Sequence, residues 1–402
     1  MAAAKSSPKP LDRRKLQSWF AHRQGLDGAL AKSSPAELLE NTGWMRSLGG
    51  AGPYLGFFAR VGLDRQNADK SVSKLEMHEL PSARGCGYVI PKADFALALA
   101  AGQSFEQSEM NVAYKLGVTD KEIAKLCDAV LTALASGPLD PDQIRDATGK
   151  ASRSLGDAGK KKGLTTTLPL AIGRLQSLGE IRKVPVNGRL DEQRFQYTLW
   201  RPNPLAKFRL TAPEIQTELA RRYFRWSAPA TLAEFQWFSG LGVGAAKKAV
   251  EPLQLIEGGS DRLIPPDLAS EFAGFRPSQQ PRYSLVSRLD GMFLLRREIS
   301  SLLDPSDASR PVYAGKGLAA LGSLTDLPSH AILDRGRLIG LWEFDPAEKR
   351  IVWASFIPKN RDLEQAVKRT EAFVRDQLGD ARAGLMDTPA SRKPRLSALA
   401  QG

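Results

Sequence analysis

Residues 119–150 read TDKEIAKLCDAVLTALASGPLDPDQIRDATGK, and residues 168–200 read LPLAIGRLQSLGEIRKVPVNGRLDEQRFQYTLW. Thr119 is a preferred helix N-cap residue, and apolar residues follow it at helical spacing as far as Gly137, which ends the segment. The next residues, 140–148, predict a short second helix.

A third helix and a hairpin complete this unit. The helix begins after Thr166 or Thr167 and ends at Gly179. Alternating runs at 180–186 and 194–200 then predict two strands joined by a turn. Three helices followed by a two-stranded hairpin is the element order of a winged helix.

The same order recurs at 212–266 and, in a more degenerate form, at 12–100. From about residue 280 the pattern changes to strand-like runs, beginning with 283–295, and an amphipathic helix follows at 361–378. We therefore expect an α+β protein with tandem winged-helix domains followed by a small β-barrel-like domain. The predicted units are a disordered tail at 1–11, winged helix 1 at 12–105, winged helix 2 at 106–205, winged helix 3 at 206–275, a β-rich domain with a terminal helix at 276–387, and a disordered basic tail at 388–402.

The chain of 402 residues carries 57 Lys and Arg against 44 Asp and Glu, which gives a net charge of +13. A surplus of this size is typical of proteins that bind a polyanion, and double-stranded DNA is the expected partner. The alternative interpretation is that the charge serves solubility alone.

Several other classes of protein are excluded by composition. The two cysteines, Cys86 and Cys127, form no CxxC pair, so neither a disulfide framework nor a zinc site is indicated. No apolar run approaches the ~20 residues that cross a membrane, and the N-terminus does not resemble a signal peptide. We expect a monomer in the cytoplasm, associated with the nucleoid, without a metal or a cofactor.

The strongest local signal for DNA contact is the stretch 149–183, in which eight Lys and Arg stand against two acidic residues. Flexible lysines and hydroxyl groups near a helix N-terminus suit phosphate oxygens. Two further cations, one in the helix over 54–60 and one in the first hairpin, are added to this set. The predicted DNA-binding residues are Lys160, Lys161, Lys162, Thr165, Thr166, Thr167, Arg174, Arg182, Lys183, Arg60 and Arg84. The alternative is a solvated charged loop.

No catalytic residue is assigned from the sequence. The three histidines fall in no metal-binding motif. Asp290, and Glu343 with Asp345, lie close to predicted strand ends, where a carboxylate can stabilise an oxocarbenium-like sugar or orient a water molecule. The alternative for each is a cap or a turn residue.

Six motifs together resemble the AlkZ-like family of DNA glycosylases over about 12–380. They are RQGL at 23–26, YLGFFAR at 54–60, RGCGYVIP at 84–91, RRYF at 221–224 with PAT and FQWFSGL at 229–241, LDGMFLLRR at 289–297 and DRGRLIGLW at 334–342. The resemblance implies tandem winged helices and a small β-barrel that hold duplex DNA. It also implies a monofunctional glycosylase that removes alkylated bases or unhooks crosslinks, without a metal or cofactor.

The resemblance places the catalytic glutamines in a QxQ or QxD motif just before the helix that contains YLGFFAR. The corresponding segment here, 46–52, reads RSLGGAG and has neither a glutamine nor a carboxylate. A histidine that the resemblance implies in the first hairpin is replaced by Gly87 or Tyr88. The glycine-rich run either brings backbone amides close to phosphate or forms a tight structural turn. A non-catalytic winged-helix regulator or architectural protein therefore remains the alternative function.

Overall fold

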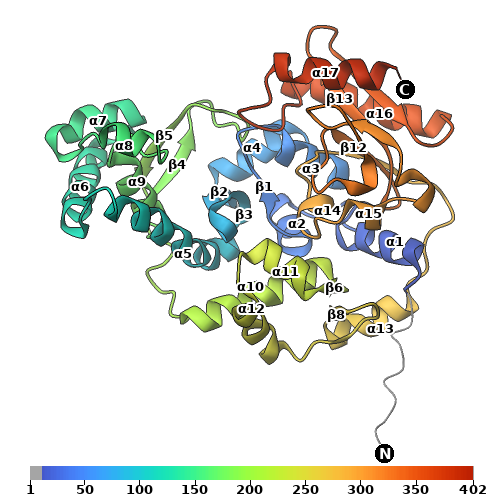
Figure 1. Ribbon diagram of the computed structural model, residues 1–402, viewed down its shortest axis with the longest axis horizontal. Coiled ribbons are helices and arrows are strands. Elements are labelled where there is room, and N and C mark those ends of the chain that lie inside the picture. Colours follow the sequence, from blue (N-terminus) through green and yellow to red (C-terminus); the bar gives the residue numbers. More distant parts are fainter. Residues whose placement is uncertain (1–10, 402) are drawn as a thin grey trace, which may run out of the picture.

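The computed structural model describes residues 11–401, an α+β protein in which a small lobe stands apart from a larger body (Figure 1). The lobe comprises residues 115–200. Apart from Leu11, the tail predicted at 1–11 lies outside the described residues. Among the residues that are described, no helix is both long enough and apolar enough to cross a membrane.

The first unit of the body combines four helices with a three-stranded antiparallel sheet of order β1-β3-β2. Its elements are α1 (Arg13–Arg23), α2 (Pro35–Thr42), β1 (Met45–Arg46), α3 (Gly52–Val61), α4 (Arg65–Ser73), β2 (Met77–Pro81), the 3-10 turn η1 (Ala83–Gly85), β3 (Gly87–Pro91) and η2 (Lys92–Asp94). Ser34 and Glu37 form a capping box at the start of α2. The three predicted helices and the hairpin are confirmed here, whereas α4 was not expected.

The small lobe contains the three helices and the hairpin that the sequence predicts. Its elements are α6 (Asp120–Ala133), η3 (Leu134–Ser136), α7 (Pro141–Thr148), η4 (Gly149–Ala151), α8 (Gly156–Lys160), α9 (Leu168–Ser177), β4 (Ile181–Pro185) and β5 (Phe195–Leu199). Thr119 accepts a hydrogen bond from the Glu122 amide and so begins α6, and Asp140 forms a capping box at α7.

A separate hydrophobic core stabilises the lobe. Ile123, Leu126, Ile144 and Leu175 are all buried in it. The lobe connects to the body through α5 (Phe95–Tyr114), a single helix that runs across the predicted boundary between residues 105 and 106. The first and second units therefore share a helix.

A third set of helices lies beneath the first unit. Its elements are α10 (Ala212–Ser227), β6 (Ala230–Thr231), α11 (Leu232–Ser239), α12 (Val243–Val250), η5 (Glu251–Leu253), β7 (Ile256–Glu257), β8 (Arg262–Ile264) and α13 (Pro266–Gly274). Thr231 and Glu234 form a capping box at the start of α11. Trp19 of α1 donates its indole N–H to the Ala228 carbonyl at 2.8 Å, so this unit packs directly against the first.

The C-terminal region is built on a four-stranded antiparallel sheet of order β14-β13-β12-β9. Its elements are β9 (Tyr283–Val286), α14 (Gly291–Leu294), α15 (Ile299–Leu302), η6 (Pro305–Asp307), β10 (Pro311–Tyr313), β11 (Leu318–Ala320), η7 (Leu321–Ser323), β12 (His330–Asp334), β13 (Arg337–Asp345), β14 (Arg350–Ser355), α16 (Arg361–Phe373), a π-helical turn η8 (Val374–Leu378) and α17 (Pro389–Ala400). Among the described strands, β14 and β9 are the edges of this sheet and do not pair with each other, so the expected barrel is an open sheet. The strand predicted over 283–295 ends at Val286 because Asp290 caps a helix.

The disordered tail predicted at 388–402 is wrong for Pro389–Ala400, which form α17 against β13 and β14. Arg392 is only 1% exposed and makes two hydrogen bonds to the Asp380 carboxylate, at 2.6 and 2.7 Å. Arg392, whose charge suggests a solvated tail in the sequence, is therefore a buried ion-pair partner of a carboxylate that precedes α17.

A buried ion pair joins the first unit to the C-terminal region. Arg60 of α3 donates two hydrogen bonds to Asp290, each of 2.8 Å, and a third of 2.7 Å to the Gln24 carbonyl. Arg60 is 4% exposed and Asp290 is 6% exposed. The prediction that Arg60 binds DNA is therefore wrong, because its guanidinium is used inside the protein.

We expect Asp290→Asn to lower the free energy of unfolding by about 3–5 kcal/mol, since it leaves the buried guanidinium without a counter-charge. The Arg60→Met, Asp290→Asn double variant should lose less unfolding free energy than Asp290→Asn alone, because it no longer contains the buried guanidinium charge. Urea unfolding measures both, with Asp326→Asn as the control at an exposed ion pair, which should lose less than about 1 kcal/mol. If Asp290→Asn lost less than about 1 kcal/mol of unfolding free energy, the structural role of the pair would be contradicted.

Burial of His78 predicts a loss of stability in mild acid. Burial lowers the pKa of this imidazole from its usual 6.5 to about 3, and neither ring nitrogen has a partner of normal hydrogen-bond geometry among the described residues. The unfolded chain binds a proton below pH 6.5 and the folded chain does not, so stability present above pH 6.5 is lost as the pH falls toward 3.

We expect His78→Phe to reduce the difference in unfolding free energy between pH 7.5 and pH 5 by about 2 kcal/mol. Phenylalanine fits the site because His78 packs edge-on against Phe95 and Trp200. His22→Phe is the control, since the hydrogen bond to Asp27 raises the pKa of His22 and its loss does not protect against acid. An unchanged acid sensitivity in His78→Phe would contradict this assignment.

Candidate nucleic-acid interface

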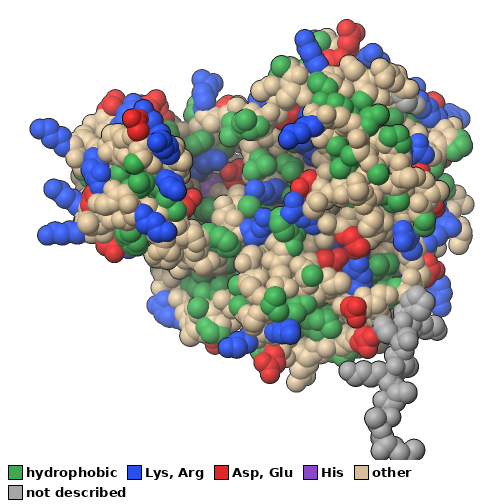
Figure 2. Space-filling model, in the orientation of Figure 1, with side chains coloured by type: hydrophobic (Ala, Val, Ile, Leu, Met, Phe, Trp, Pro, Cys, Tyr) green, Lys and Arg blue, Asp and Glu red, His purple; other side chains and the backbone are tan. Residues whose placement is uncertain are grey.

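The surface between the lobe and the body is hollowed, with Lys and Arg side chains around it (Figure 2). A cavity of about 460 Å³ opens here, within the ~300–1,000 Å³ range of small-molecule pockets. Five parts of the chain meet around it: the segment after β1, the hairpin β2–β3, the hairpin β4–β5 with its connecting loop, the segment after β9, and the loop before α17. Its lining residues are Ser47, Leu48, Gly49, Glu79, Gly87, Lys183, Glu192, Gln193, Phe195, Arg288, Leu289, Ala383, Gly384, Leu385, Met386 and Asp387.

The glycine-rich segment 46–52 forms one wall of this cavity and packs tightly against the loop before α17. A Cβ atom on Gly50 would lie 2.5 Å from the Arg382 carbonyl oxygen, so no larger residue fits without movement. The Ala51 amide donates to that same carbonyl at 2.8 Å. This packing favours the structural-turn interpretation of the run.

A carboxylate that the sequence did not single out lies in the cavity wall. Glu79 of β2 accepts a hydrogen bond from the Ser47 hydroxyl at 2.6 Å and one from the Lys183 ammonium at 2.7 Å. The side chains of Glu79 and Lys183 remain 18% and 23% exposed. Residues of three different elements thus hold one carboxylate at a site that a ligand can reach.

Two further polar residues of the cavity differ in their availability. The backbone amides of Arg194 and Gln193 donate to the Glu192 carboxylate, and these bonds lower the pKa of that group. Glu192 therefore stabilises its own loop. Gln193 lies beside Gly49, since a Cβ atom added to this glycine would be 3.7 Å from the Gln193 Cγ, an ordinary van der Waals contact.

A row of cations and aromatic rings lies beside the cavity. Arg46 stands over the ring of Tyr88 at 5.4 Å. Arg84 and Arg297 lie 3.4 and 3.5 Å from the centre of the half-buried Trp237 ring, so they occupy its two faces. Arg297 also donates two hydrogen bonds to the Asp326 carboxylate, so Arg84 is the cation of this stack whose charge suits a phosphate backbone.

The predicted lysine cluster lies at the turn after α8. Lys160, Lys161 and Lys162 are exposed there, and Thr165 is exposed close by. Lys160 has a weak ion pair with Asp157 at 3.6 Å, and its side chain is 68% exposed. These four side chains are available to a ligand.

The neighbouring threonines are less available. Thr166 is half-buried, and Thr167 is fully buried with its hydroxyl accepting from the Arg153 amide at 3.1 Å. The prediction of a DNA contact by Thr167 is wrong, because its side chain is buried and its hydroxyl is bonded to the backbone of Arg153.

The structure separates the remaining predicted cations. Arg174 is half-buried on α9, with Asp120 at 3.5 Å. Arg182 is half-buried on β4, where burial lowers its pKa. Lys183 turns to the cavity, as described above, and Arg84 lies on Trp237. The predicted set therefore forms two groups, one on the lobe and one along the cavity.

None of the three carboxylates considered from the sequence faces this cavity. Asp290 is the N-cap of α14 and the partner of Arg60. Glu343 is 1% exposed and bonded to Arg395, and burial raises its pKa. Asp345 accepts from the Ala347 amide in the turn after β13. Each has the cap, turn or structural role that was the alternative.

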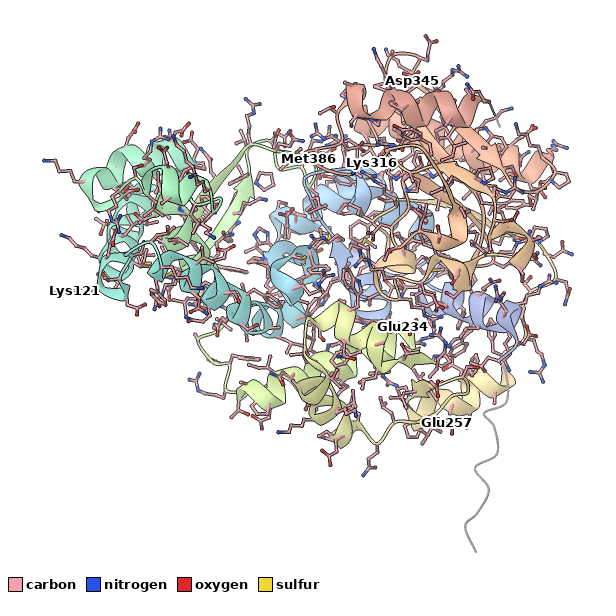
Figure 3. The ribbon with its side chains drawn as sticks, in the orientation of Figure 1. Lys121, Glu234, Glu257, Lys316, Asp345 and Met386 are labelled. Carbon is pink, nitrogen blue, oxygen red and sulfur yellow. The ribbon has the colours of Figure 1, made fainter. Side chains whose placement is uncertain are left out.

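Sequence reasoning missed Glu79, Ser47, Arg288 and Met386. Glu79 lies between the buried residues His78 and Leu80 of β2, so period-two alternation could have placed it on the more exposed face of that strand. No local pattern indicates that the loop before α17 reaches the cavity. In Figure 3, Met386 of this loop lies on the body side of the hollow, whereas Lys121 lies at the far end of the lobe.

Comparison with known proteins gives two matches. The model of the family described as DNA glycosylase AlkZ-like matches residues 44–387. The solved structure of the Streptomyces sahachiroi DNA glycosylase AlkZ is similar to this chain with a TM-score of 0.69 and 18% identity, covering 94% of this chain and 99% of that one. At this identity the structural match shows the fold. No curated protein matches the chain significantly.

We expect Lys160→Glu, Lys161→Glu, Lys162→Glu to weaken duplex binding equally on all sequences and to reduce the dependence of log affinity on log salt by about 1 for each phosphate that the variant no longer neutralises. Fluorescence anisotropy at several salt concentrations measures both effects. Lys349→Glu, Arg350→Glu, Lys368→Glu changes the net charge by the same amount on exposed positions of the C-terminal domain and serves as the control. Equally weakened binding by the two variants would show that the lysine turn does not touch the duplex specifically.

Proposed function

The chain belongs to the AlkZ-like DNA glycosylase family, and from this premise we propose that it binds double-stranded DNA over the cavity and hydrolyses the N-glycosidic bond of a damaged nucleotide. The observation that carries the catalytic part is Glu79, a carboxylate held by Ser47 and Lys183 in the wall of that cavity. The substrate class we propose is duplex DNA with an alkylated base or a crosslink.

The overall arrangement supports duplex binding. We interpret the three helix-and-hairpin units as tandem winged helices, with α9 and β4–β5 of the lobe as recognition helix and wing. The exposed lysines of the lobe and the Arg84–Trp237–Arg297 stack provide positive charge on both sides of the hollow. We propose that the protein acts as a monomer in the cytoplasm, at the nucleoid.

The chemistry assigned to Glu79 follows from its charge and partners. As the bond from C1′ to the base breaks, the sugar acquires oxocarbenium character, and an ionised carboxylate stabilises that charge. The same carboxylate can accept a proton from the water molecule that attacks C1′. Lys183 and Ser47 act as positioning residues, because each fixes one carboxylate oxygen.

A non-catalytic DNA-binding protein is the second candidate, and segment 46–52 favours it because that segment contains no glutamine and no carboxylate. Under this alternative the cavity recognises a displaced nucleotide without cleaving it. The protein would then act as a regulator or an architectural protein.

An excision assay distinguishes the two. Incubation with alkylated duplex, followed by alkali cleavage at abasic sites, should show product with the native protein and about 10²–10⁴-fold slower product formation with Glu79→Gln. Glu76→Gln, an exposed position three residues before Glu79, is the matched control and should react at the native rate.

Failure of the native protein to cleave any of several lesions, while it still binds the same duplexes, would establish the non-catalytic alternative. Native rates in Glu79→Gln would instead remove Glu79 from the mechanism and leave glycosylase activity in place.

A further inference from the structure

The loop before α17 exposes two large apolar side chains in succession. Met386 is 89% exposed and Leu385 is 63% exposed. Leu48, on the adjacent segment after β1, is 42% exposed. Isolated exposed apolar residues are common, but three that adjoin at the mouth of one cavity mark an interaction site.

The side chains of Leu48, Leu385 and Met386 belong to one exposed apolar surface. The Leu385 amide donates to the Leu48 carbonyl at 3.3 Å. Gly384 lies so close to Leu48 that an added Cβ would come within 2.8 Å of the leucine Cβ. Two segments that are far apart in the sequence thus present one apolar surface.

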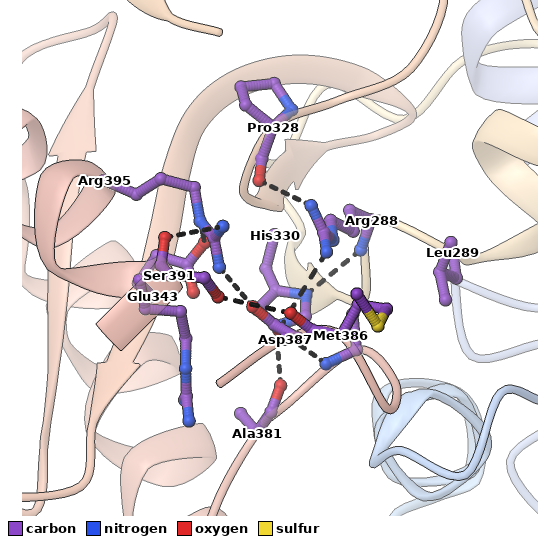
Figure 4. Close-up of polar contacts among 12 residues, drawn as sticks. Arg288, Leu289, Pro328, His330, Glu343, Ala381, Met386, Asp387, Ser391 and Arg395 are labelled. Atoms are coloured by element: carbon purple, nitrogen blue, oxygen red, sulfur yellow. Dashed lines mark hydrogen bonds and ion pairs between the residues drawn. The ribbon is translucent and has the colours of Figure 1, made fainter. Parts of the chain in front are cut away.

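The loop is held in place by buried polar contacts, so the exposure is enforced by the fold (Figure 4). Asp387 accepts from the Ala383 amide at 2.8 Å and from the Arg395 guanidinium, and Arg395 also bonds to Glu343. Upstream, His330 bonds to the Ala381 carbonyl at 2.8 Å. Met386 points away from this network, and a collapse of its side chain into the core would require these contacts to break.

The surroundings of this apolar surface indicate which kind of partner it binds. Lys183 and Arg288 line the same cavity, where Lys183 pairs with Glu79 and Arg288 lies 4.0 Å from the Asp387 carboxylate. The unpaired positive charge on this face lies further out, on the exposed lysines of the lobe. A rigid apolar projection beside a cavity, on the face across which the lysines of the lobe are exposed, fits the interior of a base stack whose phosphates lie at its edges.

We propose that Leu48, Leu385 and Met386 form a wedge that enters the base stack of duplex DNA and occupies the space left when a nucleotide moves into the cavity. This inference rests on the proposed function, since it requires that the cavity face binds duplex. It assigns the C-terminal loop a direct contact with bases, whereas the cations contact phosphate.

The test uses a duplex with 2-aminopurine next to an abasic-site analogue, because this base fluoresces more strongly when it is unstacked. The native protein should raise the fluorescence severalfold on binding. Leu385→Ser, Met386→Ser should abolish the rise and bind the abasic duplex about tenfold more weakly, while affinity for undamaged duplex changes by less than about threefold. The conservative variant Met386→Leu, with Leu385 unchanged, should keep most of the native rise in fluorescence.

Val243→Ser, Ile256→Ser removes two exposed apolar side chains of the third unit and should keep the native rise. A native rise in the Leu385, Met386 double variant would overturn the wedge. Bound native protein without any rise would overturn it too, yet would leave the proposed function standing. Absence of duplex binding by anisotropy would remove both proposals.

Discussion

The buried ion pair between Arg60 and Asp290 is the constraint on which the arrangement of this protein depends. It joins residues 230 positions apart and fixes α3 against the start of α14. Because α3 follows directly on segment 46–52, the pair also fixes where that segment meets the C-terminal domain. Removal of one partner would leave an uncompensated buried charge, so the pair strongly favours this arrangement of the two parts of the body.

The candidate site is a consequence of that junction. Its cavity lies where the first unit, the lobe and the C-terminal loop come together, and no single unit supplies more than part of the wall. Glu79 comes from the first hairpin and Lys183 from the second, so the ion pair between them also ties the lobe to the body. The lobe has its own core, but Leu190 and Trp200 are buried in the two cores of the body, and the Leu190 amide donates to the Tyr54 hydroxyl at 2.7 Å.

Much of the fold could be predicted because the signals are local. Helix caps such as Thr119, Asp140 and Thr231 are read within four residues, and hairpins are read from alternation and turn residues. Predictions were wrong where a distant partner decides the outcome. The strand expected at 283–295 ends early because Asp290 caps a helix, and the basic tail folds because its arginines find buried carboxylates.

The sequence by itself determined the order of helices and hairpins, the excess of positive charge and the presence of a lysine turn in the lobe, since each depends on neighbouring residues or on composition alone. Only the tertiary structure decided which charged groups remain free for a ligand. Arg60 is buried in an ion pair with Asp290, and Arg392 is buried in an ion pair with Asp380, whereas Lys160 remains exposed to solvent. The physical reason is that the cost of burying a charge is offset by its partner, and the partner is brought close only when the chain has folded.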